Sequence, residues 1–347
     1  MSDFSPAIFG LQGLTLSDEE AAFFHDVRPW GIILFARNIE SRDQLRALTD
    51  DLREKTGNAH LPILIDQEGG RVARLKPPLV PAYPPMGLYG ELFEKDKAAA
   101  VEAARLGAAL LAQDLFALGI SINCAPCLDL RLPETSDVIG DRAFGDDVER
   151  VVALGRAIMD GFDMGGVMPV VKHMPGHGRA TVDSHDELPR IDSDSDTLRQ
   201  SDFEPFKQLN DALLGMTGHL LFTAIDEGAA STCSKTVIGD IIRNHIGFDG
   251  VLMSDDISMS ALAGDMGARV TGALKAGCDM VLHCNGDMAE MQAVAEILPS
   301  KPSIDATPRI ARVDEALASL ESDVPKGARK VWGEIMADIF PESQNAV

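Results

Sequence analysis

The chain has 347 residues, of which 45% are hydrophobic and 24% are charged. Apolar residues at this frequency can bury a large core, which excludes intrinsic disorder for most of the chain. The sequence holds 31 Lys and Arg against 54 Asp and Glu, for a formal net charge of -23. Because this charge repels phosphate backbones and anionic lipid surfaces, we expect neither a nucleic acid nor a membrane as a partner.

The first residues include neither a basic segment nor a long apolar segment of the kind that directs secretion, and no run approaches the roughly 18 apolar residues of a membrane span. Five cysteines, an odd number, do not indicate a disulfide framework, so we expect a soluble protein in the reducing cytoplasm. Cys124 and Cys127 form a C-x-x-C pair, but no second pair follows. We interpret both as small apolar residues in and just past a buried strand.

Eight short apolar runs bounded by Gly, Pro or Asp alternate with amphipathic stretches of helical period. This alternation is typical of parallel β/α architecture, and eight repeats predict a closed (β/α)8 barrel, the TIM barrel, rather than an open sheet. The expected strands cover residues 7–11, 31–35, 62–65, 120–124, 167–171, 214–217, 251–253 and 279–283. We predict a single domain over residues 1–340, with a covering helix at 308–320 and a frayed tail at 341–347.

Polar clusters follow three of the expected strands, at the end where barrels of this type carry their active sites. The clusters are DQEGGRVAR (66–74), KHMPGHG (172–178) with DSH (183–185), and SDD (254–256). Carboxylates, histidines and basic groups converging on one rim suit a glycosidase, which needs a nucleophile or base below the sugar and a proton donor above it.

Single members of these clusters also have simpler interpretations. Asp256 could cap the next helix at Ser258, Asp66 could order the glycine turn that follows it, and His177 could be a hydrogen-bonding loop residue. Adjacent residues of a strand point to opposite sides, so we expect only one of Asp255 and Asp256 to face a substrate.

The strings DQEGGR (66–71), KHMPGHG with DSH, and GFDGVLMSDDISM (247–259) resemble the β-N-acetylglucosaminidases of glycoside hydrolase family 3, the NagZ type. The similarity extends in order from WGIILFARN (30–38) to AGCDM (276–280). It implies a single-domain (β/α)8 enzyme that retains anomeric configuration. Such enzymes remove the terminal N-acetylglucosamine of muropeptides, GlcNAc-1,6-anhydroMurNAc-peptides, during peptidoglycan recycling.

The resemblance also implies residue roles. Asp255 would be the nucleophile that forms a glycosyl-enzyme, His185 the acid/base catalyst, and Asp183 the partner of His185. The positions that bind the terminal sugar would be Asp66, Arg74, Arg142, Lys172 and His173. No metal or other cofactor is expected.

Physical chemistry agrees with these roles. Asp255 directly follows a buried strand, so its carboxylate would sit on a rigid support. A histidine acid/base has an ordinary pKa of about 6.5, which suits proton exchange near neutral pH. Asp183 precedes His185 by two residues and could fix its tautomer. The Pro- and Gly-containing stretch from Met174 to His185 should be a mobile loop that closes over the substrate.

Other functions remain open from the residues themselves. A histidine acid/base does not repel phosphate, so a phosphorylase or a broader β-glycosidase on the same scaffold is the main alternative. The zinc-like spacing of His173 and His177 and a Schiff-base role for Lys172 are weaker ones, and a sugar-binding protein without activity is remote. An anionic substrate would require Arg74, Arg142 and Lys172 to make the site locally positive.

Overall fold

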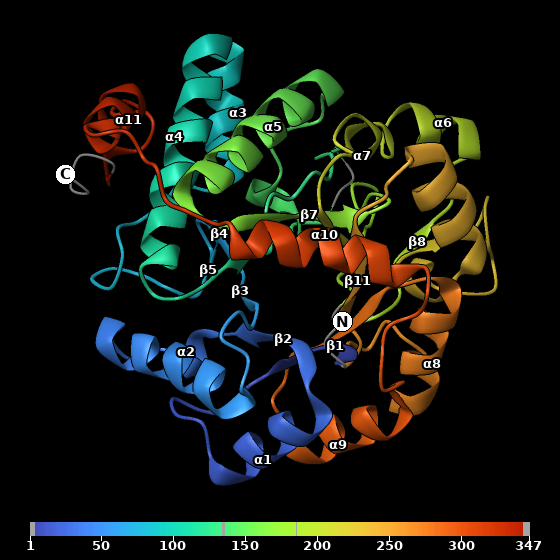
Figure 1. Cartoon of the computed structure of the whole chain (residues 1–347). Coiled ribbons are helices and arrows are strands. Elements are labelled where there is room, and N and C mark those ends of the chain that lie inside the picture. The colour runs from blue at the N-terminus through green and yellow to red at the C-terminus, as the bar shows by residue number, and fades with distance from the viewer. Residues whose placement is uncertain (1–3, 134–135, 185, 343–347) are drawn as a thin grey trace.

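The computed structural model describes residues 4–133, 136–184 and 186–342. Its centre is a closed barrel of parallel strands in the order β1-β12-β11-β9-β7-β6-β3-β2 (Figure 1). The predicted TIM barrel is therefore confirmed, and each of its strands overlaps an expected run. The strands are β1 (Ser5–Gly10), β2 (Pro29–Leu34), β3 (Ile63–Ile65), β6 (Ile122–Asn123), β7 (Met168–Met174), β9 (Leu214–Thr217), β11 (Val251–Asp256) and β12 (Met280–His283).

Helices surround the barrel and follow its strands along the chain (Figure 1). They are α1 (Asp18–Val27), α2 (Arg42–Thr56), α3 (Met86–Lys95), α4 (Lys97–Phe116), α5 (Val148–Gly165), α6 (Ser195–Gln200), α7 (Glu204–Gln208), the π-helix η4 (Val237–Ile246), α8 (Met266–Ala276), α9 (Met288–Ile297), α10 (Ala306–Ala318) and α11 (Ala328–Met336). In the described part of the chain, no helix has the length and apolar character needed to span a bilayer.

The loops between the barrel strands and helices contain shorter elements. Two small sheets, β4 (Gln67–Gly69) with β5 (Val72–Ala73) and β8 (Arg190–Ile191) with β10 (Leu221–Phe222), stand apart from the barrel. The 3-10 turns are η1 (Ala36–Asn38), η2 (Gly140–Arg142) and η3 (Ser231–Cys233).

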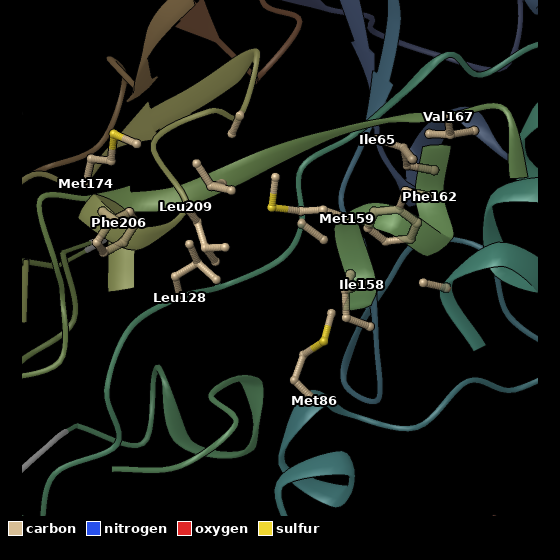
Figure 2. Close-up of a cluster of buried hydrophobic side chains, with 14 of the residues drawn as sticks. Ile65, Met86, Leu128, Ile158, Met159, Phe162, Val167, Met174, Phe206 and Leu209 are labelled. Carbon is tan, nitrogen blue, oxygen red and sulfur yellow. The ribbon is translucent and has the colours of Figure 1, made fainter. Parts of the chain in front are cut away.

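Strand alternation divides the barrel side chains between two cores. Ile8, Ile33 and Leu64 face the barrel interior, whereas their neighbours Ala7 and Phe9 face the helices. Figure 2 shows part of the outer core, which lies between β7, α5 and α7. Its labelled residues are Ile65, Met86, Leu128, Ile158, Met159, Phe162, Val167, Met174, Phe206 and Leu209.

The helix expected near the carboxyl end, α10, lies across one mouth of the barrel (Figure 1). Ala306, Ile310 and Val313 of α10 pack into the interior core, and the Trp30 indole N–H donates to Asp314 at 3.2 Å. Trp30 lies at the start of β2, so α10 closes the N-terminal mouth and leaves the opposite mouth for a site. The domain boundary at residue 340 stays a prediction, and residues 343–347 of the expected tail lie outside the described part.

Helices α4 and α5 approach each other closely because α5 carries glycines at the contact. A Cβ on Gly161 would lie 2.2 Å from the Arg105 carbonyl oxygen and 2.7 Å from the Ala108 Cβ. Both distances are too short for a side chain, so any larger residue at position 161 must push the two helices apart.

We expect Gly161→Ala to lower the free energy of unfolding by about 1–3 kcal/mol, because the added methyl group overpacks the α4–α5 contact. The matched control is Gly267→Ala in α8, where the nearest atoms to an added Cβ lie at an ordinary 3.5 Å. That change should be neutral or stabilising by up to about 1 kcal/mol. Urea denaturation of both variants measures the difference, and equal destabilisation would contradict the close-packing argument.

Candidate active site

A pocket of about 300 Å³ opens at the C-terminal ends of the barrel strands. The structure brings together at this pocket the predicted residues Asp66, Arg74, Arg142, Lys172, His173, Asp183 and Asp255. The remaining predicted residue, His185, lies outside the described part of the chain. A larger hollow of about 820 Å³ lies at the other mouth, beside the ends of α1, α2 and α10, away from these residues.

The pocket floor is the top layer of the barrel core. Met216 of β9 and Leu282 of β12 belong to the interior core and also line the pocket. Phe35, which follows β2, forms part of the wall, and the Arg74 guanidinium lies 5.2 Å from its ring centroid. The site therefore combines an apolar base with a cation held over an aromatic ring.

The β4–β5 hairpin carries three pocket residues, and Gln67 fixes its shape. The Gln67 side-chain oxygen accepts the N–H groups of Arg74 and Leu75 at 2.8 and 3.0 Å. The turn passes through Gly69, whose φ of 103° and close approach to Pro84 exclude a side chain. Gln67 thus ties the two arms of the glycine turn, and Asp66, proposed for this task, also reaches across the turn to Arg74 at 3.0 Å.

Asp66 also belongs to a buried network of alternating charges. The Lys172 ammonium on β7 donates to Asp66 at 2.9 Å and lies 2.8 Å from Glu68. Arg74 binds the second Asp66 oxygen at 3.0 Å, and Arg142 binds both oxygens of Glu68 at 2.9 and 2.8 Å. The network joins the hairpin, η2 and β7.

Pairing keeps all these groups ionised. Burial alone would raise the pKa of Asp66 and Glu68, but the cations outweigh it and hold both pKa values below the ordinary range. Burial alone would lower the pKa of Lys172, but Asp66 and Glu68 raise it above its usual value. A protonated amine with two carboxylate partners is a poor nucleophile, so this arrangement disfavours the Schiff-base alternative for Lys172.

A second buried carboxylate orients His173. Asp129, in the loop after β6, lies 2.7 Å from His173 Nδ1 and accepts the His177 backbone N–H at 2.7 Å. Arg142 Nη2 lies 3.4 Å from His173 Nε2 and can only donate, so His173 Nε2 is the acceptor and Nδ1 carries the proton. Burial would raise the pKa of Asp129, but His173 and His177 lower it to about 2.

The other cysteine and histidine hypotheses can be compared with this arrangement. Cys127 is fully buried, as expected, but its thiol also contacts Asp129 at 3.2 Å. Cys127, Asp129 and His173 could together face a metal, although Asp129 already binds the other two. His173 lies on β7 and Gly176 has a φ of 146°, so the spacing of His173 and His177 is not helical.

Asp255 lies where β11 leaves the regular ladder. A β-bulge between Met253 and Asp256 sets three residues of β11 against two of β12. Such bulges re-aim side chains beside active sites. Burial alone would raise the pKa of Asp255, but nearby His219 and His173 and a backbone N–H outweigh it and lower that pKa. Asp255 is therefore an ionised carboxylate at the pocket.

The neighbouring Asp256 has a structural task. Its carboxylate accepts the Ser258 N–H at 3.0 Å, the Ser258 hydroxyl at 2.8 Å and the Cys284 N–H at 3.2 Å. The expected bond to Ser258 is present, but Asp256 caps a turn and not a helix, because the next helix, α8, begins only at Met266. Asp255 accepts only the Asp256 N–H, at 2.8 Å, among the hydrogen bonds described for its carboxylate.

The loop after β7 is only partly as expected. Residues 175–180 are largely buried, and they are held by the His177–Asp129 bond and by Arg179, whose Nε donates to Asp202 at 2.8 Å. Beyond them, Thr181 and Glu187 are exposed and Asp183 is half-buried at the pocket. The expectation of a mobile segment from Met174 onward is therefore wrong for its first half, because Asp129 and Asp202 fix it.

The pocket lacks the local positive charge that an anionic substrate would require. Five carboxylates face four cations there. The carboxylates are those of Asp66, Glu68, Asp183, Asp255 and Asp256, and the cations are those of Arg71, Arg74, Arg142 and Lys172. Each of these cations is paired with a carboxylate. The pocket is thus not locally positive.

Sequence reasoning missed Glu68 and Asp129, although both are central to the site. Glu68 belongs to the DQEGGR string, two residues after Asp66, and that shared direction along an extended chain was an available signal. Asp129 follows Cys127 in an irregular loop and offered no local signal. Its importance comes from His173 and His177, which are 44 and 48 residues away.

Comparisons with known proteins agree with this geometry. The model of the glycosyl hydrolase family 3 N-terminal domain matches residues 10–315. A β-hexosaminidase of Chromobacterium violaceum is 39% identical over 312 residues, which cover 89% of this chain and 86% of that protein. A β-hexosaminidase of Bordetella avium is 35% identical over 342 residues and 96% of each chain.

Solved structures share the fold of this chain over nearly its whole length. NagZ from Neisseria gonorrhoeae, solved in complex with N-trifluoroacetyl-D-glucosamine, superposes with a TM-score of 0.85 and 29% identity over 98% of each chain. The family match begins at the last residue of β1, covers the other seven barrel strands and includes every pocket residue named above. The chain therefore belongs to glycosyl hydrolase family 3, in the group of its β-hexosaminidases of the NagZ type.

Proposed function

We propose that this protein is an exo-acting, retaining β-N-acetylglucosaminidase that removes the non-reducing terminal GlcNAc of muropeptides. The observation that carries the proposal is the ionised Asp255 at the end of β11, beside a set of paired charges that we call the cradle. The cradle consists of Asp66, Glu68, Arg74, Arg142 and Lys172. The β-hexosaminidase relatives and the sugar-bound NagZ neighbour support the N-acetylglucosamine part. The muropeptide part rests on the family resemblance of the sequence, and a cytoplasmic location rests on the cysteine usage and the first residues of the chain.

The cradle suits a neutral sugar with several hydroxyl groups. Asp66 offers carboxylate acceptors, and Arg74 and Arg142 offer guanidinium donors. His173 lies against Arg142 through Nε2 and lines the same pocket. All are held in place before substrate arrives, so little reorganisation accompanies binding. We propose that these groups and Lys172 bind the terminal sugar.

The proposed reaction has two displacements. An Asp255 oxygen attacks the anomeric carbon while His185, as imidazolium, gives its proton to the departing glycosidic oxygen, which leaves with the bonding electron pair. Water then attacks the same carbon, neutral His185 takes the water proton, and Asp255 departs as a carboxylate. Asp183 would orient and stabilise the His185 imidazolium.

The first test is the release of nitrophenol from the β-N-acetylglucosaminide and the β-glucoside, each with and without phosphate. The proposal expects cleavage of the acetamido sugar that does not depend on phosphate. Dependence on phosphate would establish the phosphorylase instead, although the carboxylates around the pocket disfavour an incoming dianion. Equal cleavage of both sugars would establish the broader β-glycosidase, and release of GlcNAc from purified muropeptides tests the aglycone.

We expect Asp255→Asn to lower kcat for the nitrophenyl substrate by about 10³-fold or more, because the amide cannot form the glycosyl-enzyme. The matched control is Asp256→Asn, which keeps an acceptor toward Ser258 and should lose far less, on the order of 10-fold. Steady-state kinetics with mass spectrometry of trapped glycosyl-enzyme measures both. A larger loss for Asp256→Asn would reverse the assignment.

The pH dependence of kcat/KM should report one carboxylate and one imidazole. Because the pKa of Asp255 is lowered, its active ionised form persists to acid pH, and activity should fall only below about pH 4. His185 must be protonated, so activity should fall as pH rises through an ordinary imidazole pKa of about 6.5. In His185→Ala, assayed with a dinitrophenyl leaving group that needs no acid, the alkaline fall should vanish; its persistence would exclude His185 as the acid.

We expect Glu68→Gln to raise KM by roughly 10-fold with a smaller effect on kcat, because Arg142 and Lys172 lose the carboxylate that places them. Asp141→Asn is the control, since Asp141 is an exposed partner of Arg71 and its loss should leave KM nearly unchanged. Thermal unfolding of both variants confirms that they are folded at the assay temperature. An unchanged KM for Glu68→Gln would show that the cradle does not bind the sugar.

A further inference from the structure

A buried chain of side-chain hydrogen bonds lies beside the strand that carries Asp255. Its members are Thr217 at the end of β9, His219 two residues later, and Thr232 in η3, and each of the three is 0% exposed. They do not line the pocket, so they cannot touch a substrate there. Their partners at one end are the backbone groups of Asp255 and Asp256.

These backbone groups need partners because regular strand pairing stops before them. The last pair described between β11 and β9 is Met253 with Met216. On the other side, the bulge of β11 against β12 begins at Met253. The Asp255 N–H and the Asp256 carbonyl therefore lie beyond the β9 ladder, where a buried polar group without a partner is costly.

Side chains of Thr217 and His219 bind these two backbone groups in place of a neighbouring strand. The Thr217 hydroxyl accepts the Asp255 N–H at 3.4 Å, and His219 Nε2 lies 2.9 Å from the Asp256 carbonyl oxygen. The same His219 ring lies 2.7 Å from the Thr232 hydroxyl through Nδ1. The two hydroxyls of Thr217 and Thr232 are 2.7 Å apart, which closes the chain.

The direction of every hydrogen bond follows from its partners. A carbonyl oxygen only accepts, so His219 Nε2 carries the proton. Burial lowers the pKa of His219, so its ring is neutral and Nδ1 holds a lone pair. The Thr232 hydroxyl has one proton and lies 2.7 Å from His219 Nδ1 but 3.2 Å from the Gly218 carbonyl oxygen, so it donates to the closer His219 Nδ1. Thr217 then donates to Thr232 while its own oxygen receives the Asp255 N–H.

The far end of the chain is anchored in η3. The Ser231 N–H donates to the Leu220 carbonyl at 2.7 Å, and the Leu220 N–H donates to the Ser231 hydroxyl at 3.2 Å. The Ser231 hydroxyl also donates to the Gly218 carbonyl. The loop that carries His219 is therefore tied to η3 on both sides of the imidazole, and His219 has a fixed position from which to act.

We propose that His219, as the neutral Nε2–H tautomer, is a positioning residue that fixes the Asp256 carbonyl and, through Thr232 and Thr217, the Asp255 N–H, and so aims the Asp255 carboxylate at the anomeric carbon. This inference rests on the proposed role of Asp255 as nucleophile. A displacement of about 1 Å at a reacting atom can cost on the order of 10²-fold in rate, which sets the size of the expected effect.

The test compares two amides that replace different nitrogens of His219. In His219→Gln the amide N–H reaches the position of Nε2 and can still donate to Asp256, whereas in His219→Asn the amide reaches only the position of Nδ1. We expect His219→Asn to lower kcat by about 10²-fold with KM changed less than about 3-fold. His219→Gln should recover kcat to within roughly 10-fold of wild type.

A second measurement, the rate of covalent labelling, follows the attack of Asp255 without the proton-transfer step. A 5-fluoro N-acetylglucosaminyl fluoride carries its own good leaving group, so the rate at which it labels Asp255 needs no proton donor. Labelling should slow in His219→Asn by the same factor as kcat and recover in His219→Gln. Thr232→Val, which keeps the side-chain shape, should slow labelling and Thr232→Ser should restore it, so the inference survives if one histidine variant fails to fold.

Labelling distinguishes an error in the nucleophile from an error in the positioning role of His219. If the wild-type protein is labelled at a residue other than Asp255, the proposed nucleophile is wrong and the positioning role falls with it. If wild type is labelled at Asp255 but His219→Asn is labelled equally fast, only the positioning role is overturned. Equal slowing in His219→Asn and His219→Gln would also overturn it, because the cause would then be packing and not the lost donor.

Discussion

The pairing of Lys172 with Asp66 and Glu68 is the interaction on which the site depends. An ammonium group whose side chain is 3% exposed cannot remain charged without carboxylate partners, and the partners come from a hairpin 106 residues earlier in the chain. Glu68 in turn holds Arg142 from a third segment. One requirement, that buried charge be neutralised, therefore ties β7, the β4–β5 hairpin and η2 into a single rigid wall.

The same requirement decides which groups can exchange protons. Asp66, Glu68 and Lys172 are fixed in their charged forms by one another, and burial lowers the pKa of His177 to about 4 and also lowers that of His219. None of these groups can therefore serve as an acid near neutral pH. A proton donor has to come from a less enclosed segment, which is why we propose one from the loop after β7 that begins to be exposed at Thr181.

The barrel could be predicted from the sequence because its signals are local. Each strand is a short apolar run with its own boundaries, and the amphipathic period of α5 follows from Val151, Leu154 and Ile158 alone. Asp66 directly follows β3 and Asp255 lies near the end of β11, so both belonged to the polar clusters expected at strand ends, and the family resemblance assigned their roles. Asp129 was not found, because its role is set by His173 and His177 across the fold, and the packed state of residues 175–180 was missed for the same reason.

The choice between Asp255 and Asp256 shows how local and non-local effects combine. Strand alternation predicts that only one of the two carboxylates faces the substrate, but both residues line the pocket. They differ in their hydrogen bonds, because Asp256 is committed to the turn at Ser258. Alternation alone, however, does not explain how the Asp255 carboxylate keeps a fixed position. The backbone at Asp255 lies beyond the last β9 pair, and a strand without ladder partners would fray. The β11 bulge sets the direction of the Asp255 side chain. Thr217 at the end of β9 and His219 in the loop after it bind the Asp255 N–H and the Asp256 carbonyl. The position of Asp255 is thus built by two strands that the sequence separates by 34 residues or more, which is why no single motif could reveal it.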